Sequence, residues 1–276
     1  MNRLSAGLRA GVVSVIVLGL TTGPTVRASG EEKPQAHEGQ AQGAQAHEAH
    51  PPHWTYEGDT GPTHWSELAP EFSLCAAGHA QSPIDLSATK REASPALEFH
   101  YRPSHLNELN NGHTIQVNYD AGSSISVGGV RYDLVQVHFH IPSEHTVGGK
   151  AYAAEAHLVH KSADGQLAVI GLLIDRGAAS QPLAQLWAHL PATEGPVHQE
   201  TGNLNAARLL PAKHAAWRYE GSLTTPPCTE GVHWFVLESP ITLSAEQLER
   251  LRGILHVNNR PVQPLHERTV SEDPLP

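Results

Sequence analysis

The chain has 276 residues, of which 39% are hydrophobic, and a formal net charge of -10 from 18 Lys and Arg against 28 Asp and Glu. A chain of this length can form one all-β domain of roughly 220 to 250 residues with a sizeable core. The acidic balance and the lack of any basic run of five or more residues argue against nucleic acid as a partner.

The first 28 residues have the pattern of an export signal. Arg3 and Arg9 are positive, residues 11–20 are apolar, and VRA at 26–28 resembles a cleavage site. An apolar stretch of about ten residues is too short to span a bilayer stably. We therefore predict a signal peptide over residues 1–28, no membrane span after its cleavage, and a periplasmic or secreted domain. A retained anchor is the alternative, and it would leave the domain in the same compartment.

Residues 29–52 have the composition of a linker. They contain no aromatic or β-branched side chain and are rich in Gln, Ala, Glu and Gly. Such a segment cannot bury enough apolar surface to fold, so we predict a disordered, solvated linker. The alternative is metal capture by the histidines of this stretch and its border: His37, His47, His50 and His53.

The two cysteines, Cys75 and Cys228, fit an exported protein. An even count in that compartment favours a disulfide, and two cysteines allow one pairing. Closing a loop of roughly 150 residues contributes on the order of 5 kcal/mol in the chain-entropy model. Two free buried thiols are the alternative.

Short alternating segments dominate residues 53–276, which we predict to be one domain. The clearest strand patterns are TIQVNY (114–119), SISVGGVRYDLVQVHFHI (124–141), AEAHLVH (154–160) and VHWFVLES (232–239). Helical patterns are few: residues 180–190, and SAEQLERLRGI from Ser244, where Gln247 can complete a capping box. The pattern indicates a mostly β domain with short helices at its edge.

Two histidines share one face of the predicted strand that ends at residue 141. Positions two apart point the same way, so Gln136, His138 and His140 lie together. The opposite, packed face should carry Val135, Val137, Phe139 and Ile141.

A turn through residues 143–152 would return the chain as an antiparallel neighbour, on which Glu155, His157 and Val159 share a face. Three imidazoles, His138, His140 and His157, could then converge. Three neutral histidines without a thiolate are typical of catalytic zinc, which keeps its fourth position for water. Ordinary core or surface histidines are the alternative.

Two polar residues near these histidines favour the metal interpretation. Gln136 and Glu155 each lie two residues before a candidate ligand. There an amide oxygen or a carboxylate can accept the remaining ring N–H and raise the basicity of the histidine. The alternative is that both are ordinary inward-facing polar residues.

Five separated motifs resemble those of the α-class carbonic anhydrases. They are QSPID (81–85), NNGH (110–113), HFHIPSEHTVGGKAYAAEAHLVH (138–160), GSLTTPPC (221–228) and NNRPVQPL (258–265). The resemblance covers about residues 53–268. It implies a mainly β (α+β) fold, in which short peripheral helices surround a large central, mostly antiparallel twisted sheet.

The resemblance also implies a reaction, the zinc-dependent reversible hydration of carbon dioxide to bicarbonate and a proton. Zinc at His138, His140 and His157 would make hydroxide available near neutral pH. By resemblance, Thr224 accepts the proton of that hydroxide and Glu144 accepts the hydroxyl proton of Thr224, which directs the nucleophile at carbon dioxide.

The remaining roles also follow from the resemblance. Carbon dioxide is apolar and needs a dry pocket, implied at Val159, Leu167, Val169, Leu223, Thr224, Thr225 and Trp234. His113 matches the proton shuttle, and the unperturbed histidine pKa of about 6.5 suits that role. A water network is implied at Tyr56, Asn111 and Gln116, although Gln116 departs from the asparagine of many members while keeping an amide.

Two other function classes compete with the enzyme. A non-catalytic binding module of the same family should lack at least one zinc histidine, and all three are present. A periplasmic zinc carrier would use the histidines of residues 29–52 for capture. The expected partners are the small-molecule substrate, carbon dioxide or bicarbonate, and, as a candidate homodimer, a second copy of the chain.

Overall fold

The computed structural model describes residues 52–87 and 89–273. The predicted signal peptide and nearly all of the predicted linker lie outside these residues. Within them, no helix is long and apolar enough to cross a membrane.

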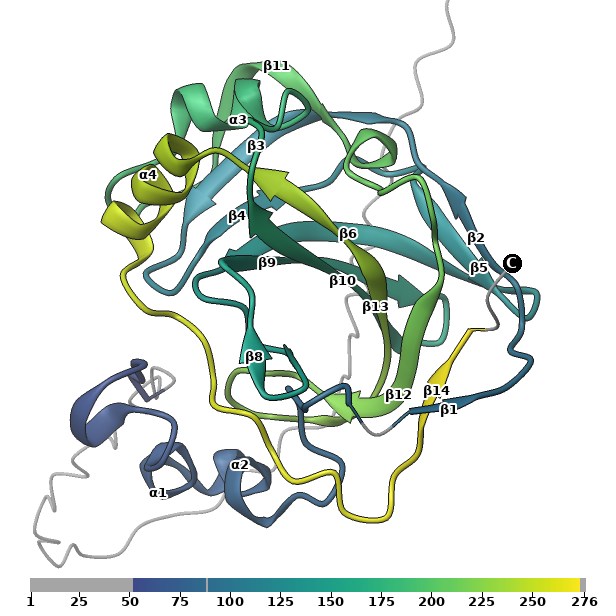
Figure 1. Ribbon diagram of the computed structural model, residues 1–276. Coiled ribbons are helices and arrows are strands. Elements are labelled where there is room, and N and C mark those ends of the chain that lie inside the picture. Colours follow the sequence, from purple (N-terminus) through teal and green to yellow (C-terminus); the bar gives the residue numbers. More distant parts are fainter. Residues whose placement is uncertain (1–51, 88, 274–276) are drawn as a thin grey trace, which may run out of the picture. The chain divides into compact units, whose positions relative to one another are not determined.

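One large curled sheet dominates the described residues (Figure 1). In order across the sheet its strands are β1 (Thr89–Arg91), β14 (Val270–Glu272), β12 (Ala216–Ser222), β13 (Glu230–Leu243), β10 (Leu167–Arg176), β9 (Ala154–Ser162), β6 (Val130–His140), β4 (Ile115–Asn118), β3 (Pro103–Asn110) and β11 (His198–Asn205). Pairing is parallel between β1 and β14 and between β10 and β13, and antiparallel at the other pairs.

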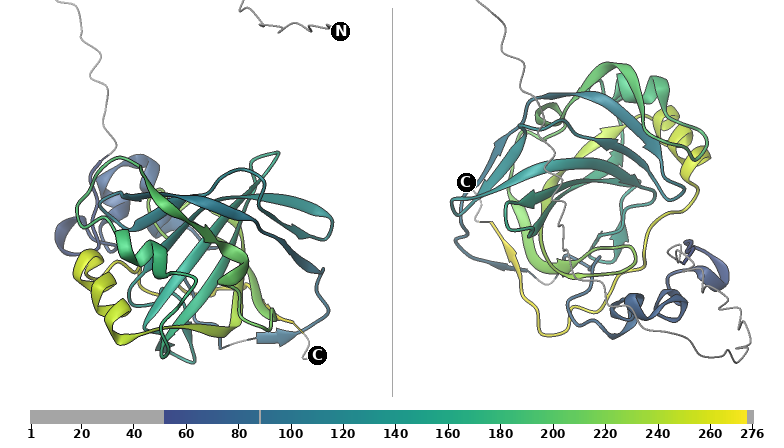
Figure 2. Two further views of the ribbon diagram at one scale, coloured as in Figure 1. Left: turned by 90° about the horizontal axis from the view of Figure 1, so that it is seen from above. Right: turned by 180° about the vertical axis from the view of Figure 1, so that it is seen from behind.

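Within the described residues, four short strands lie outside this order. β5 (Ser124–Val127) pairs with β6 and with β2 (Leu97–His100), and β7 (Thr146–Val147) forms a hairpin with β8 (Lys150–Ala151). Figure 2 shows from two further sides how the sheet curls. The predicted mainly β fold with a large, mostly antiparallel sheet is confirmed.

Short helices lie at the edge of the sheet. They are η1 (Gly58–Thr60), α1 (Trp65–Leu68), η2 (Pro70–Phe72), α2 (Leu74–Ala77), α3 (Ala184–His189), η3 (Ala206–Arg208) and α4 (Ala245–Leu255). The predicted capping box of α4 is present, because Ser244 and Gln247 each bond the backbone of the other. The helix predicted over 180–190 is shorter than expected, and the amide of Ser180 instead donates to the side chain of Gln247 (2.8 Å).

The two faces of the sheet bury different groups. On β6 and β9 the residues Val137, Phe139, Ala156 and Leu158 belong to the main hydrophobic core, which also includes side chains of α3 and α4. The alternate residues of the same strands face the other side, where the candidate site lies.

One residue departs from the predicted alternation. Leu134 pairs with His160 while Gln136 pairs with Val159, so Val135 is an extra residue at a β-bulge. Its side chain is 46% exposed. The prediction that Val135 packs with Val137 was wrong, because the bulge shifts the phase of the strand just before the two histidines.

Candidate metal centre and active site

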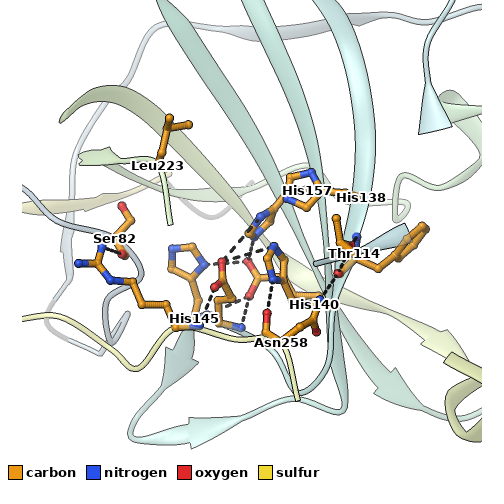
Figure 3. Close-up of polar contacts among 12 residues, drawn as sticks. Ser82, Thr114, His138, His140, His145, His157, Leu223 and Asn258 are labelled. Carbon is orange, nitrogen blue, oxygen red and sulfur yellow. Dashed lines mark hydrogen bonds and ion pairs between the residues drawn. The ribbon is translucent and has the colours of Figure 1, made fainter. Parts of the chain in front are cut away.

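The pairing of β6 with β9 brings the three predicted ligands together (Figure 3). His138 lies directly opposite His157 in the antiparallel register, and His140 is two residues further along the same face. One ring nitrogen from each of the three side chains lies within 4.8 Å of the others. The predicted turn through 143–152 forms as the β7–β8 hairpin and makes this register possible.

Each of these histidines uses its second ring nitrogen for a hydrogen bond to an acceptor. His138 Nδ1 lies 2.8 Å from Gln136 Oε1, and His157 Nε2 lies 2.9 Å from Glu155 Oε1. Gln136 and Glu155 are thus placed as the sequence predicted. Because an amide or carboxylate oxygen only accepts, these ring nitrogens must carry the protons. The lone pairs are therefore on His138 Nε2 and His157 Nδ1.

The third acceptor has no side-chain signature in the sequence. His140 Nδ1 donates to the backbone carbonyl oxygen of Asn258 (2.8 Å), a residue at the start of the NNRPVQPL motif to which no role was assigned. The lone pair of His140 is then on Nε2. This nitrogen is buried and has no hydrogen-bond partner among the described residues, so a polar atom able to bind a metal points into the centre of the cluster.

These observations fit zinc. Burial and the neighbouring imidazoles lower the pKa of His138 well below its usual value, and burial also lowers the pKa of His140. Both rings are therefore neutral at physiological pH, as metal ligands must be. Three imidazoles with inward lone pairs and no thiolate are the donor set of a catalytic zinc site.

A second possible metal group shares His157 but fits less well. It consists of His145, Glu155 and His157. Glu155 Oε1 accepts from His145 Nδ1 (2.7 Å) and from His157, and His145 Nε2 lies 2.6 Å from the hydroxyl of Tyr219. Every ring nitrogen of His145 is thus already engaged. We interpret this group as the support of His157, a role that the sequence analysis missed for His145 and Tyr219.

Glu144 lies next to the free ring nitrogens. Its Oε2 is 3.5 Å from His140 Nε2 and 3.9 Å from His157 Nδ1, and its Oε1 accepts from the amide of Arg260 (2.8 Å). Thr224 is buried in the loop after β12. In the part of the chain that the structure describes, Oε2 of Glu144 has no hydrogen-bond partner, so the bond expected from Thr224 to this oxygen is not formed.

The apolar residues assigned to the substrate gather in one cluster. Val169 and Trp234 are buried in it, and Val159, Leu167 and Leu223 pack against it. The cluster also contains Val232, a buried side chain on β13 that the sequence analysis did not single out. Val159 is two residues beyond His157 on β9, so the apolar surface begins beside the candidate ligand.

His113 and the residues assigned to the water network line a small pocket with the metal histidines. The pocket has a volume of about 120 Å³ and its wall includes Tyr56, Asn111, His113, Gln116, His138, His140 and Thr225. Asn111 Oδ1 accepts from the amides of His113 and Thr114, so it shapes the turn that carries His113. Gln116 donates to Asn118 Oδ1 (2.6 Å).

The ring of His113 stacks on Trp54, with centroids 3.6 Å apart and planes 6° apart. Trp54 is a further residue that the sequence analysis missed. His113 also lines a second pocket of about 570 Å³ with His53 and His256. Burial and His53 lower the pKa of His113, and Glu194 opposes this. His113 thus borders both the pocket of the metal histidines and an outer pocket.

The predicted disulfide is present. Cys75 and Cys228 are joined, at a sequence separation of 153. Cys228 lies four residues after Thr224, and its amide donates to the carbonyl oxygen of Thr225 (2.8 Å). The disulfide therefore ties the threonine loop to α2.

Comparison with known proteins agrees with this geometry. The profile of the eukaryotic-type carbonic anhydrase family matches residues 60–274. The chain belongs to the α-class carbonic anhydrases. The predicted family and enzyme class, a zinc lyase, are therefore confirmed.

Bacterial relatives align over most of the domain. A carbonic anhydrase of Klebsiella pneumoniae is 44% identical over 223 residues, 80% of this chain and 91% of the relative. One of Pectobacterium carotovorum is 42% identical over 219 residues, 79% of this chain and 90% of the relative. The solved α-carbonic anhydrase of Thermovibrio ammonificans, in complex with sulfanilamide, superimposes with a TM-score of 0.77 at 42% identity, covering 80% of this chain and all of that chain.

Proposed function

We propose that this carbonic anhydrase hydrates carbon dioxide reversibly to bicarbonate and a proton, with zinc held by His138, His140 and His157. The observation that carries the proposal is the convergence of three imidazoles whose outer nitrogens all bond an acceptor. Among the described residues, one of the inner nitrogens, His140 Nε2, is buried without a hydrogen-bond partner. When bound, zinc supplies a Lewis acid that lowers the pKa of water to about 7.

The side chains around this centre have separate tasks in the proposal. Thr224 accepts a hydrogen bond from the nucleophile and donates its own proton to Glu144, which leaves one lone pair directed at carbon dioxide. Support for this comes from the free Oε2 of Glu144, which faces the metal histidines and lacks a donor. A buried acceptor without a donor costs free energy, so a hydroxyl donor at this oxygen would be stabilising.

The substrate contacts follow from its chemistry. Carbon dioxide offers no hydrogen-bond donor, so an apolar wall binds it by excluding water. Val159, Val169 and Trp234 lie in one cluster next to His157 and provide such a wall. Leu167, Leu223 and Thr225 complete the proposed substrate site.

The proton then has to leave the centre. We propose His113 as its acceptor, through water held by Tyr56, Asn111 and Gln116, because these residues share one pocket with His138 and His140. The second pocket, which His113 also lines, gives buffer a place to receive the proton. The expected His113→Ala phenotype is a lower kcat that imidazole buffer restores, with kcat/KM unchanged.

The experiment that tests the function is stopped-flow hydration of carbon dioxide by the purified protein, with zinc and after chelation, beside the variant His157→Ala. We expect zinc-dependent turnover in the wild type and none above background in the variant. His160→Gln is a matched control, because His160 is buried on the same strand but bonds Tyr101 on the opposite side (2.9 Å). A folded, zinc-loaded wild type without turnover would refute the proposal.

The proposed location is the periplasm or the outside of the cell. The Cys75–Cys228 disulfide supports it, because disulfides persist in oxidising compartments. Fractionation of cells that express the full chain should place the protein outside the cytoplasm, with a mature N-terminus after residue 28. Deleting residues 31–52 should leave hydration unchanged if the chain is an enzyme and lower metal capacity if it is a carrier. The homodimer stays a prediction, which sedimentation would check.

A further inference from the structure

Residues 258–260 contact the site through their backbone. The carbonyl oxygen of Asn258 accepts from His140 Nδ1 (2.8 Å), and the amide of Arg260 donates to Glu144 Oε1 (2.8 Å). A candidate zinc ligand and the carboxylate beside it are therefore held by main-chain atoms of one short segment. Main-chain atoms can hold them in place only if the segment itself is fixed.

The side chain of Asn258 fixes one end of the segment. Its Oδ1 accepts from the amide of Ile141 (2.7 Å), and its Nδ2 donates to the carbonyl oxygens of Phe139 (2.9 Å) and His113 (3.0 Å). These contacts attach the segment to the end of β6 and to the turn that carries His113.

The side chain of Arg260 fixes the other end. It is 1% exposed, and its Nη1 donates to Gln81 Oε1 and to the carbonyl oxygen of Ser82, both at 2.8 Å. Its Nη2 donates to the carbonyl oxygen of Cys75 (2.7 Å), and the guanidinium lies 5.7 Å from the ring centroid of Trp65. Within the described residues, all its side-chain hydrogen bonds go to residues 75–82.

The same N-terminal residues are tied to the threonine loop. Cys75 is bonded to Cys228, and Gln81 Nε2 donates to the carbonyl oxygen of Cys228 (3.0 Å). The guanidinium of Arg260 therefore bonds the same residues, within 75–82, that also hold the loop of Thr224.

We propose that Arg260 is a positioning residue for the reaction. Its side chain fixes the segment 258–260, which holds Glu144, to residues 75–82, and these same residues hold the loop of Thr224. Arg260 thereby sets the distance between Glu144 and Thr224. This inference rests on the proposed function. Arginine suits the role because its planar fork meets several acceptors in a fixed geometry, whereas lysine is a point charge on a flexible stem. The backbone N–H of Arg260 remains in any substitution, so what changes is its placement.

The test is Arg260→Lys in the full chain. We expect kcat/KM for carbon dioxide hydration to fall about tenfold, the lower end of the range for residues that support metal ligands. The effect on kcat should be smaller, because kcat/KM covers the steps up to attack and kcat also contains the later proton release through His113. His113→Ala should show the opposite split.

A second measurement does not depend on activity. Because the carbonyl of Asn258 orients His140, the zinc Kd of Arg260→Lys should rise by about tenfold in chelator competition. In the apo protein, amide hydrogen exchange of residues 258–260 should be faster than in the wild type, since the amide of Arg260 loses its fixed place against Glu144.

Arg218→Lys is the matched control. Arg218 is also mostly buried, pairs with Asp273 (2.9 Å) and lies over Phe235, and its side-chain hydrogen bonds within the described residues go to Asp273 and to the carbonyl oxygen of Pro95. We expect its kcat/KM and zinc Kd to equal the wild-type values. If Arg260→Lys fails to fold, Gln81→Met, of similar volume, removes one guanidinium acceptor together with the hydrogen bond to the carbonyl oxygen of Cys228, and should act in the same direction.

The outcomes separate the two proposals. A folded Arg260→Lys or Gln81→Met protein with wild-type kcat/KM and wild-type zinc Kd would overturn the positioning role. If the wild type itself fails to hydrate carbon dioxide, the proposed function fails, and the zinc Kd and amide exchange still decide whether Arg260 supports the site.

Discussion

Two glutamates of this protein are equally buried and differ in almost every other respect. Glu155 on β9 is 0% exposed and Glu108 on β3 is 1% exposed. The carboxylate of Glu155 accepts from the amides of Glu144 and His145 and from the rings of His145 and His157. Both carboxyl oxygens of Glu108 lack a hydrogen-bond partner within residues 52–87 and 89–273.

The difference shows in their protonation. Burial raises the pKa of both, but His145 and His157 hold the pKa of Glu155 well below its usual value. Burial, with a smaller effect of Glu200, raises the pKa of Glu108 to about 7. A buried carboxyl group is thus charged or neutral according to its donors and not its depth. Glu155 supports the candidate metal centre, whereas Glu108 should make the free energy of unfolding depend on pH.

The largest expected difference between Glu155 and Glu108 is the change in zinc affinity when each is replaced by glutamine. Glu155→Gln puts an amide NH₂ where donors now converge and weakens the support of His157, so we expect zinc binding to weaken by about 10- to 100-fold. Glu108→Gln should leave the zinc Kd unchanged. Chelator competition on both variants measures the difference.

Equal zinc Kd values for the two variants would contradict the comparison. Thermal unfolding of each apo variant is the necessary control, because Glu155→Gln leaves an N–H of His145 or its backbone without an acceptor. A loss of zinc affinity that exceeds any loss of apo stability assigns the effect to the ligand.

The convergence of the three histidines could be predicted from the sequence. His138 and His140 follow from a period of two, and His157 follows from one turn and an antiparallel return. Their alternation survives because the bulge at Val135 lies before them. The bulge itself could not be foreseen, since it depends on how two strands pair and not on the residue at the extra position.

The supports of the site were harder to predict. Gln136 and Glu155 were found because they lie two residues from a ligand on the same strand face. The acceptor for His140 is a backbone carbonyl 118 residues away, and a carbonyl oxygen is present in every residue. The contacts of Arg260 likewise form only when segments far apart in the sequence meet in the fold. The lack of donors around Glu108 also arises only there.

Glu108 should make the stability of the wild type fall as pH rises. The folded protein keeps Glu108 protonated up to a pKa of about 7, whereas an unfolded glutamate loses its proton near its ordinary pKa of 4.5. The folded state therefore binds more protons in this interval, so its stabilisation is complete below the unfolded pKa and is lost as pH passes the folded one. The gap corresponds to at most about 3 kcal/mol.

Denaturant unfolding of wild type and Glu108→Gln at pH 5 and pH 8, with the same zinc concentration, checks this. At pH 5 Glu108 is neutral in the folded protein, so the two free energies of unfolding should differ by much less than at pH 8. At pH 8 the variant should be the more stable protein, by at most about 3 kcal/mol. A difference that is the same at both pH values would mean that Glu108 does not titrate in this range.

The smallest expected effect concerns the share that Glu200 has in raising the pKa of Glu108. Besides burial, the group faces Glu200 on β11, which lies 3.6 Å from His189 of α3 and is partly exposed. Because an exposed charge acts weakly, Glu200→Gln should lower the pKa of Glu108 by less than about 0.7. Carboxyl ¹³C NMR titration, with the signal assigned from Glu108→Gln, measures it. A fall of more than a full pH unit would make repulsion by Glu200 the dominant cause, and the contrast with Glu155 would then rest on neighbouring charge instead of missing donors.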